Sequence, residues 1–301
     1  MEPDRYHQPV LADAVVELLT DIPGGPVIDA TYGGGGHSRL LAAAGRDIVA
    51  FDRDPDVPPP PPGVHLVRRP FGELGTALDE LGIDAISGAL FDLGVSSHQL
   101  DTAERGFSYR HRGPIDMRMD PDAPLSAAEI VDAWPEAELA DVIRRFSDER
   151  YARRIAAAIV AARPIGDTAT LAEVVRAAIP APARRTGGHP ARRTFQALRI
   201  AVNDELGQLR EGLDAAIARL APGGRCIAIS YHSLEDRIVK RRFADETRGC
   251  VCPPEQPICT CDRTPAAAPV PRKPLRPDPE EIEANPRARS AILRGIERVA
   301  A

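Results

Sequence analysis

A run of glycines near the start of the chain is the first feature whose residue types suit chemistry. The apolar pair Val27-Ile28 leads to Asp29, four glycines occupy 33–36, and a helical pattern begins at Ser38. Because glycine has no Cβ, such a turn lets backbone N–H groups at a helix N-terminus touch a ligand. The alternative is a flexible turn without a ligand. Neither the G-x-G-x-x-G fingerprint nor a P-loop fits these glycines, which disfavours a dinucleotide and a phosphate cradle.

An acidic residue follows the second apolar run. That run, Ile48–Phe51, leads directly to Asp52. A carboxylate at the end of the second strand is where α/β folds hold a ribose hydroxyl pair. A glycine loop and a ribose acid without a phosphate site together suggest S-adenosylmethionine. Phe71, beyond the third apolar run, is either a ring that stacks on adenine or a core residue.

Polar residues also follow the fourth apolar run. The run over 85–91 gives way to Asp92, and two serines, Ser96 and Ser97, follow on the same turn. Ligands in open parallel sheets bind beyond the carboxyl ends of the strands, so we expect these side chains to face the glycine loop. They suit orientation of a substrate's polar edge. The alternative is a turn aspartate and a serine that caps a helix.

The elements that must position these residues form an α/β sheet interrupted by helices. Apolar runs predict strands at 27–28, 48–51, 64–67, 85–91 and 225–230, and helical spacing predicts a helix over 9–19. Five prolines, 58–62, exclude an ordinary helix between the second and third strands. The pattern is helical for about 95 residues from Leu125, with capping boxes at Ser126-x-x-Glu129 and Thr170-x-x-Glu173.

A helical domain is therefore predicted to lie within the sheet domain. We place the sheet domain at 1–105 and 206–301 and the insert at 106–205. The proline-rich segment 265–279 is expected to be extended and mobile, and 285–290 leads into a last helix or strand.

The amino-acid composition limits the classes of protein to which this chain can belong. The chain has 301 residues, of which 27% are charged and 43% are apolar, which are ordinary values for globular domains. The longest apolar stretch, 155–162, is too short to cross a bilayer, and the N-terminus has no apolar signal core. We therefore expect a cytoplasmic protein without a membrane partner.

Arginine clusters are the candidate nucleic-acid contacts. The net charge of −6 argues against indiscriminate coating of nucleic acid, so any contact must come from local patches. One cluster comprises Arg184, Arg185, Arg192, Arg193 and Arg199, and a second comprises Arg237, Lys240, Arg241 and Arg242. Arginine forks suit RNA or DNA phosphates, and the alternative for either cluster is a solvated helix face. His232, after the fifth strand, is either a base, an RNA contact or a structural residue.

Five cysteines complete the candidate groups. Cys226 lies within a predicted buried strand and is expected to be a small core residue. The other four, Cys250, Cys252, Cys259 and Cys261, form two C-x-C pairs. A structural zinc, reduced thiols and disulfides are the three alternatives for this set, and a cytoplasmic chain disfavours the disulfides.

Several motifs together resemble the bacterial 16S ribosomal RNA cytosine-N4 methyltransferases, the RsmH or MraW family. The resemblance covers nearly the whole chain. It is carried by DATYGGGGHS at Asp29–Ser38, DRDP at Asp52–Pro55, DLGVSS at Asp92–Ser97, ERGFS at Glu104–Ser108, GPIDMRMD at Gly113–Asp120, RTFQALRI at Arg193–Ile200, SYHSLEDRIVK at Ser230–Lys240 and NPRARS at Asn285–Ser290. Three departures are the proline run after the ribose acid, His98 where proline is common, and the four-cysteine segment, which only part of the family has.

The resemblance implies a class I methyltransferase fold with an inserted helical domain. It implies that the cofactor is S-adenosylmethionine and that the cofactor binds at the glycine loop and the strand ends. It also implies that the substrate is a cytidine in the decoding region of small-subunit RNA, methylated on its exocyclic nitrogen. The predicted cofactor site comprises Gly34, Gly35, Gly36, His37, Asp52, Phe71, Asp92 and Gln99. The predicted RNA contacts are Arg184, Arg185, Arg192, Arg193, His232 and Lys240.

Asp92 and Ser96 are the predicted catalytic residues. The cytosine amine is a weak nucleophile, so the enzyme must orient it toward the methyl group. Asp92, or a backbone carbonyl of 92–97, is expected to accept a hydrogen bond from the amine, and no cysteine nucleophile is required. Two rival functions stay open, a DNA amino-methyltransferase and a non-catalytic factor that binds ribosomal RNA. The partner is expected to be 16S RNA or the small subunit, and the chain to be a monomer or a homodimer.

Overall fold

The computed structural model describes residues 9–185, 188–253, 256, 258–261 and 263–300. These residues form two compact units. The first comprises 1–94 and 206–301, and the second comprises 95–205. The second unit thus begins at Val95, whereas the sequence analysis placed the start of the insert at residue 106. The functional assignment of the two parts stays a prediction.

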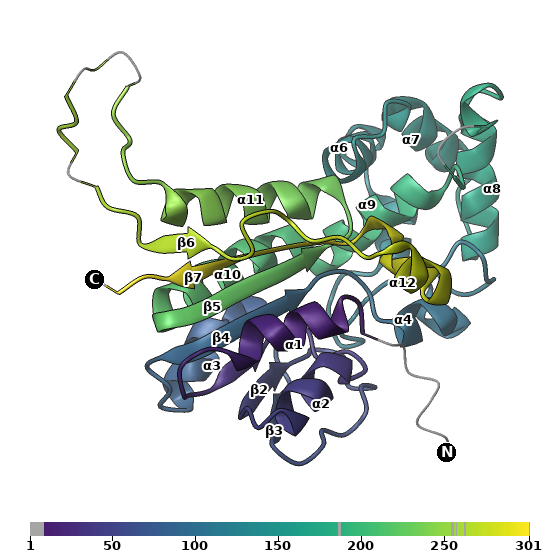
Figure 1. The fold of residues 1–301 in the computed structure, drawn as a ribbon. Helices are drawn as coiled ribbons and strands as arrows, with labels where there is room; N and C mark the ends of the chain where they lie inside the picture. The colour runs from purple at the N-terminus through teal and green to yellow at the C-terminus, as the bar shows by residue number, and fades with distance from the viewer. Residues whose placement is uncertain (1–8, 186–187, 254–255, 257, 262, 301) are drawn as a thin grey trace. The chain divides into compact units, whose positions relative to one another are not determined.

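The first unit is built on a seven-stranded sheet in the order β3-β2-β1-β4-β5-β7-β6 (Figure 1). The strands are β1 (Val27–Asp29), β2 (Ile48–Phe51), β3 (Val64–Val67), β4 (Ile86–Asp92), β5 (Leu220–Ser230), β6 (Ala267–Pro269) and β7 (Ile292–Arg298). The strands from β3 to β5 are parallel, and β7 pairs antiparallel with β5. The predicted α/β fold class, a class I methyltransferase sheet, is confirmed.

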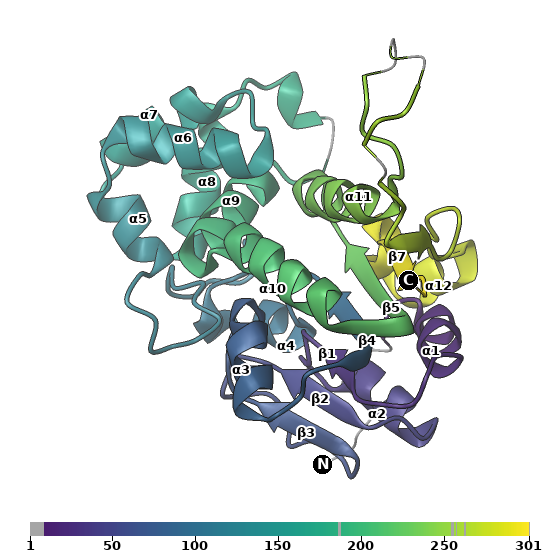
Figure 2. The ribbon, with the colours of Figure 1, turned by 90° about the vertical axis from the view of Figure 1, so that its left-hand side faces the viewer.

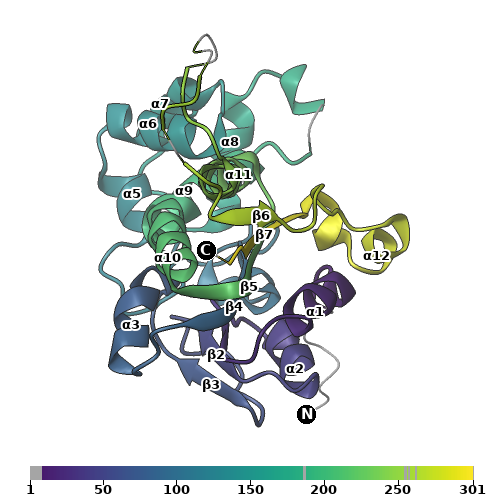
Figure 3. The ribbon, with the colours of Figure 1, turned by 60° about the vertical axis from the view of Figure 1, so that its left-hand side comes forward.

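Helices cover both faces of this sheet (Figures 2 and 3). One layer consists of α3 (Leu74–Glu80), α10 (Glu205–Arg219) and α11 (Ser233–Thr247), with the 3-10 helix η2 (Phe71–Glu73) on the same side. The other consists of α1 (Ala12–Thr20), α2 (Gly36–Ala43) and α12 (Pro279–Ala284), with the 3-10 helix η5 (Pro286–Ser290). Successive strand residues alternate between the layers: Ala89 and Phe91 pack with α3 and α10, while Leu90 packs with α1 and α2. This alternation explains why the strands are continuous apolar runs.

Local details of the first unit differ from the sequence prediction. The fifth strand begins at Leu220 rather than Arg225. Ile86 of β4 pairs with Leu220 and Gly88 pairs with Arg225, so a register shift between these two pairs keeps residues 221–224 within the strand. The proline-rich segment is not simply a mobile tail, since its residues 267–269 form β6 at the sheet edge. An edge strand tolerates a proline, which lacks the N–H donor. Residues 52–63, all of which the structure describes, contain no helix, as the proline run predicted.

The second unit is helical and has a core of its own. Its helices are α4 (Ser97–Asp101), α5 (Ala127–Ala133), α6 (Glu136–Ser147), α7 (Ala152–Ala161), α8 (Thr168–Ala178) and α9 (Arg192–Asn203), with the 3-10 helices η3 (Ala103–Arg105) and η4 (Ala183–Arg185). The capping box at Ser126 is confirmed. The one predicted at Thr170 is wrong, because Asp167 caps α8 and accepts a hydrogen bond from the Thr170 N–H.

The long polar loop of the second unit, between Arg105 and α5, is fastened by side chains. The Arg105 guanidinium donates to the Met119 carbonyl at 2.9 Å. The Asn203 side chain, from the end of α9, accepts from the Met119 N–H at 2.8 Å. Since Asn203 is itself buried, these bonds satisfy a polar group inside the unit as well as fixing the loop.

Helix length bears on membrane insertion. The longest described helices, α10 and α11, have 15 residues each. In the part of the chain that the structure describes, no helix combines the length and the apolar character needed to cross a bilayer.

Candidate active site

The candidate site lies at the carboxyl ends of the strands in the first unit. The chain runs outward from β1 through β2 to β3 and then crosses to β4 on the other side of β1, so the strand order reverses between β1 and β4. Open parallel sheets bind ligands at such a switch point. Asp29 ends β1, Asp52 follows β2 and Asp92 ends β4. Three carboxyl groups therefore gather around one edge of the sheet.

The glycine loop joins β1 to α2 in a conformation that favours glycine. Gly33 and Gly35 have φ of 52° and 70°, in the left-handed region. A Cβ at Gly35 would come within 2.6 Å of the Tyr32 hydroxyl, and one at Gly36 within 3.2 Å of Pro9. The Gly35 N–H donates to the Tyr32 carbonyl at 2.7 Å, which closes the turn just before α2 begins. The sequence prediction of strand, tight turn and helix holds here.

Asp29 is structural in this arrangement. It is buried, and its two oxygens accept from the Ser38 hydroxyl at 2.6 Å and the Thr31 N–H at 3.2 Å. Burial raises the pKa of this carboxyl. Because both oxygens already bind the glycine-loop region, Asp29 holds the loop against β1.

Asp52 also binds the glycine loop, but it is only half-buried. Its Oδ2 accepts from the Gly33 N–H at 2.8 Å and its Oδ1 from the Asp54 N–H at 2.9 Å. Burial raises the pKa of Asp52 to about 6, and the two backbone hydrogen bonds partly oppose this rise. Each carboxylate oxygen can accept more than one hydrogen bond, so Asp52 keeps acceptor capacity for a hydroxyl pair.

Asp92 has its two oxygens in different surroundings. Oδ1 accepts from the Tyr231 hydroxyl at 2.7 Å, and burial is the largest cause of a strongly raised pKa for that hydroxyl. Oδ2 lies 3.4 Å from Nε2 of His37. The backbone N–H of Asp92 donates to the Thr31 hydroxyl at 2.7 Å, which ties the end of β4 to the glycine loop. Tyr231 and Thr31 thus orient the Asp92 carboxylate.

His37 is one of several buried side chains of the first unit whose polar atoms lack a hydrogen-bond partner within the described residues. The ring is 6% exposed, and neither ring nitrogen has a hydrogen-bond partner within the described residues. Buried polar groups in native proteins are normally satisfied, and Nε2 of this ring only approaches Asp92 at 3.4 Å, so a polar ligand beside the glycine loop is compatible with its surroundings. This observation fits the predicted cofactor role of His37.

Phe71 keeps both predicted interpretations open. It starts η2, is half-buried, and packs edge-to-face on Phe91 with ring centroids 5.9 Å apart. The following Gly72 N–H donates to Gln208 of α10 at 2.9 Å, which fixes the turn. One side of the Phe71 ring therefore belongs to the core contact with Phe91.

Ser96 and Gln99 lie in the second unit and form the capping box of α4. The Ser96 hydroxyl accepts from the Gln99 N–H at 3.2 Å, and the Gln99 amide oxygen accepts from the Ser96 N–H at 3.1 Å. This is the helix-cap alternative weighed for Ser96. The catalytic role of Ser96 and the cofactor role of Gln99 stay predictions.

His232 caps α11. Its Nδ1 accepts from the Glu235 N–H at 3.4 Å, and its Nε2 lies 3.0 Å from the buried Glu235 carboxylate. The carboxylate also accepts from the Tyr231 N–H at 2.8 Å. The structural interpretation of His232 accounts for these contacts, and its RNA contact stays a prediction.

The predicted RNA-binding residues differ in their surroundings. Arg192 and Lys240 are exposed, and the exposed Arg193 lies 3.6 Å from Glu149. Arg184 donates to the carbonyls of Ile179 and Ala177 and so caps the end of α8. Arg185 ends η4.

One member of the first arginine cluster is not a surface contact. Arg199 forms a two-point ion pair with Glu205 at 2.7 and 2.8 Å, and the two side chains are only 14% and 10% exposed. Its inclusion among the phosphate contacts is wrong, because a carboxylate within the same unit already occupies the guanidinium. In the second cluster, Arg242 is paired with Asp214 and Glu246.

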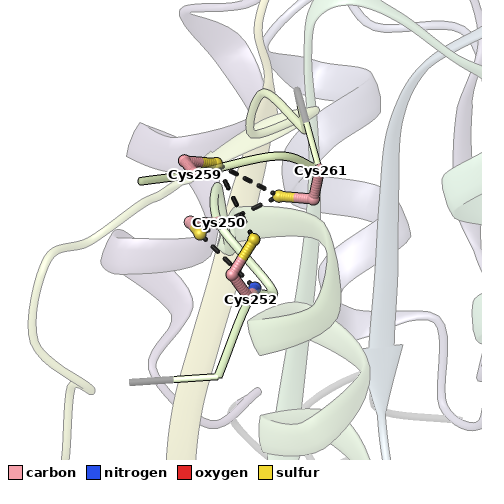
Figure 4. A group of neighbouring side chains, drawn as sticks. All are labelled: Cys250, Cys252, Cys259 and Cys261. Atoms are coloured by element: carbon pink, nitrogen blue, oxygen red, sulfur yellow. Dashed lines mark hydrogen bonds between the residues drawn. The ribbon is translucent and has the colours of Figure 1, made fainter. Parts of the chain in front are cut away.

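The cysteines form the two groups that the sequence predicted, one buried residue and a set of four. Cys226 is fully buried in β5, where burial raises the pKa of its thiol to about 12. The other four lie on the segment between α11 and β6, and their sulfur atoms are all within 4.8 Å of one another (Figure 4). None of these five described cysteines is in a disulfide.

Sequence reasoning missed the residues that support the predicted ones. Tyr231, Thr31 and Glu235 were not candidates, although each directly contacts a candidate residue or its neighbour. A signal was present for Tyr231, because it immediately follows β5, the neighbour of β4 in the sheet. A tyrosine at that position can reach a carboxylate at the end of the adjacent strand.

The chain was compared with known proteins. The model of the MraW methylase family matches residues 4–299. Ribosomal RNA small subunit methyltransferase H of Symbiobacterium thermophilum is 51% identical over 97% of this chain and 96% of its own length. The protein of the same name from Heliobacterium modesticaldum is 49% identical, over 98% and 99%. An rRNA methylase structure from Streptococcus thermophilus covers 96% of this chain and 94% of its own at 12% identity, with a TM-score of 0.40, which is too distant to add to the fold assignment. The chain belongs to the MraW methylase family.

Proposed function

We propose that this chain transfers a methyl group from S-adenosylmethionine to the exocyclic N4 of a cytidine in the decoding region of 16S ribosomal RNA. The names of the two relatives support the ribosomal RNA substrate. The observation that carries the chemistry is the Asp92 carboxylate, held at the end of β4 by the Tyr231 hydroxyl at 2.7 Å beside the glycine loop. A fixed acceptor at this position suits a substrate whose reacting group is an N–H donor.

The residues of the first unit fit the cofactor. Asp52, after β2, would accept hydrogen bonds from the ribose hydroxyls while the Gly33 and Asp54 N–H groups hold it in place. The His37 ring, which has no hydrogen-bond partner within the described residues, would gain one, and Phe71 would pack against the adenine. Gly34, Gly35 and Gly36 would allow close backbone approach, and Gln99 is a further proposed contact of the cofactor. Bound S-adenosylmethionine supplies an electrophilic methyl group on a positively charged sulfur.

Asp92 acts on the amine in this proposal. The lone pair of a cytosine amino group is delocalised into the ring, so the amine attacks only when it is held in line with the methyl group. An N–H of the amine donates to Asp92, which fixes this orientation. Formation of the N–C bond would break the bond between the methyl group and the cofactor sulfur, with S-adenosylhomocysteine as the leaving group. The nitrogen would then carry one proton more than the product, and Asp92 would accept this proton. Tyr231 is a positioning residue, because it acts through Asp92. Ser96 is the second proposed catalytic residue.

The RNA would be held by arginines on the second unit and by α11. Arg192 and Arg193, at the start of α9, and Lys240 on α11 have exposed side chains that can reach phosphates. We propose the same role for Arg184, Arg185 and His232. The target base must leave its stack to be methylated, and phosphate contacts on either side of it would stabilise that state.

The direct test uses isotope-labelled S-adenosylmethionine and three acceptors: unmethylated small subunits, naked 16S RNA and duplex DNA. Nucleoside mass spectrometry is expected to find the label in N4-methylcytidine from ribosomal RNA. Label only in DNA would support the DNA amino-methyltransferase, and cofactor binding without methyl transfer would support the non-catalytic factor. Either result would overturn the proposal.

Two variants test the role of Asp92. Asp92→Asn is expected to lower kcat about 10²- to 10⁴-fold at saturating cofactor, the range for loss of a proton acceptor. Tyr231→Phe keeps the carboxylate and removes one hydrogen bond to it, so we expect a loss of about tenfold. If Asp92→Asn kept full turnover, the assignment would be wrong. If Tyr231→Phe were as inactive as Asp92→Asn, the hydroxyl itself would have to take part in the reaction.

A further inference from the structure

The loop between α11 and β6 ends in a group of four thiols that the proposed function does not use. The loop leaves α11 after Thr247 and returns to β6 at Ala267. Its base is closed by a hydrogen bond from the Ala266 N–H to the Glu246 carbonyl at 2.9 Å. Beyond this base it extends away from the sheet of the first unit (Figures 1 and 2).

Hydrophobic burial does not account for the gathering of the thiols. Cys250 and Cys259 are exposed, and Cys252 and Cys261 are only half-buried. The apolar neighbours Val251 and Ile258 are 48% and 73% exposed, so the described residues of the loop tip form no core. Long loops without secondary structure are uncommon in compact domains, and small segments without a core generally need a disulfide or a metal.

The sulfur positions match a single tetrahedral metal ion. A zinc ion with four thiolates at about 2.3 Å separates the sulfurs by about 3.8 Å. The Cys250 and Cys261 sulfurs are 3.8 Å apart, Cys252 and Cys259 are 4.0 Å apart, and Cys259 and Cys261 are 3.5 Å apart (Figure 4). A disulfide would need about 2.05 Å. Because all four sulfurs lie within 4.8 Å of one another, one ion can touch all of them.

The backbone supports thiolates at these positions. The Val251 N–H points at the Cys261 sulfur at 3.4 Å, and the Thr260 N–H points at the Cys252 sulfur at 3.5 Å. The Cys252 N–H likewise donates to the Cys250 sulfur at 3.4 Å. Each donor belongs to one of the two C-x-C segments, 250–252 and 259–261. These segments therefore fix the sulfurs and favour their charged form.

We propose that Cys250, Cys252, Cys259 and Cys261 bind one zinc ion that closes this loop. Four protein ligands fill a tetrahedral zinc, so no position is left for water or substrate and the site is structural rather than catalytic. The ion stabilises the loop in place of a hydrophobic core, because it links the chain segment that follows α11 to the segment that precedes β6. The proposal does not depend on the methyl-transfer reaction.

Metal analysis of the full chain tests the site. After purification under reducing conditions and dialysis, mass spectrometry of the metal content is expected to find one zinc per chain. Cobalt exchanged into the site is expected to give thiolate charge-transfer absorption and the intense red bands of tetrahedral cobalt. Cys252→Ser with Cys261→Ser should lose both signals, whereas Cys226→Ala, the matched control in β5, should keep them.

A second measurement follows the loop itself. Removal of zinc with a chelator is expected to speed proteolytic cleavage within residues 248–266 and to leave the affinity for S-adenosylhomocysteine within about twofold. Four free thiols and no metal in the native chain would overturn the proposal. So would a mass four hydrogens lower, which means two disulfides, or iron in place of zinc. These outcomes are read on the wild-type chain, so they hold even where the double variant does not fold.

Discussion

If Asp52 binds the ribose hydroxyls as we propose, its raised pKa makes cofactor affinity depend on pH. The carboxyl group sits after β2, where burial raises its pKa to about 6. Ribose hydroxyls donate hydrogen bonds to a carboxylate. A protonated carboxyl group has less acceptor capacity, and its O–H is a donor beside the Gly33 N–H, which is itself a donor to this group. Binding therefore selects the ionised form, and lowering the pH is the perturbation that removes it.

The size of the effect follows from the pKa of about 6. The group is about 90% ionised at pH 7 and about 10% ionised at pH 5, so the affinity is expected to fall about tenfold, or about 1.4 kcal/mol. The stability of the free protein depends on pH in the opposite direction to the cofactor affinity. A folded pKa above the unfolded value of 3.8 means that the native state holds the proton longer, so this group's contribution to stability falls as the pH rises from about 4 to 6.

Calorimetric titration with S-adenosylhomocysteine between pH 5 and 8 measures this dependence. Two buffers of different ionisation enthalpy report the proton released on binding. Asp52→Asn is the control, because it is expected to bind weakly and with no pH slope in this range. A flat wild-type profile would refute the reasoning. The same slope in Asp52→Asn would assign it to another group, such as the buried Asp29 or the ligand itself.

Three further substitutions test other parts of the structure. Arg199→Met leaves the Glu205 charge buried and unpaired, so the free energy of unfolding should fall by about 3 kcal/mol, and adding Glu205→Met should recover most of it in denaturant titrations. Gly106→Ala places a Cβ 2.1 Å from a backbone carbonyl and should lower the melting temperature far more than Gly82→Ala, whose Cβ meets nothing within 4 Å at a similar positive φ. Phe71→Leu should weaken S-adenosylhomocysteine binding up to about tenfold with little change in melting temperature if the ring stacks on adenine. A large drop in melting temperature with unchanged affinity would make Phe71 a core residue only.

The strand ends could be predicted from the sequence because local patterns define them. An apolar run that stops at a carboxylate marks both the end of a buried strand and a group at the sheet edge. Asp52 and Asp92 were found in this way, and the glycine loop by its composition. These features depend on residues near one another in the chain.

Which particular side chains contact one another could not be predicted in the same way, whether they are near or far apart in the chain. The Tyr231 hydroxyl reaches Asp92 only because β4 and β5 pair, although the helical segment separates them in sequence. Arg199 looked like a phosphate contact because its partner, Glu205, is recognised only once α9 and α10 are oriented. The α8 cap was misplaced because Asp167 and Thr170 both have capping side chains and only the backbone decides between them.

The division of the first unit across the chain has a consequence for synthesis on the ribosome. When β4 leaves the exit tunnel, its partner β5 does not yet exist, because residues 95–205 must be made first. At about 5–20 residues per second this takes on the order of 10 s. The second unit is one continuous segment with its own core and short-range helix contacts, so it folds during this interval. Throughout, the apolar edge of β4 lacks its neighbour, and an unpaired strand edge invites association with other chains. We therefore expect chaperones to bind the nascent chain at the stage between its two halves.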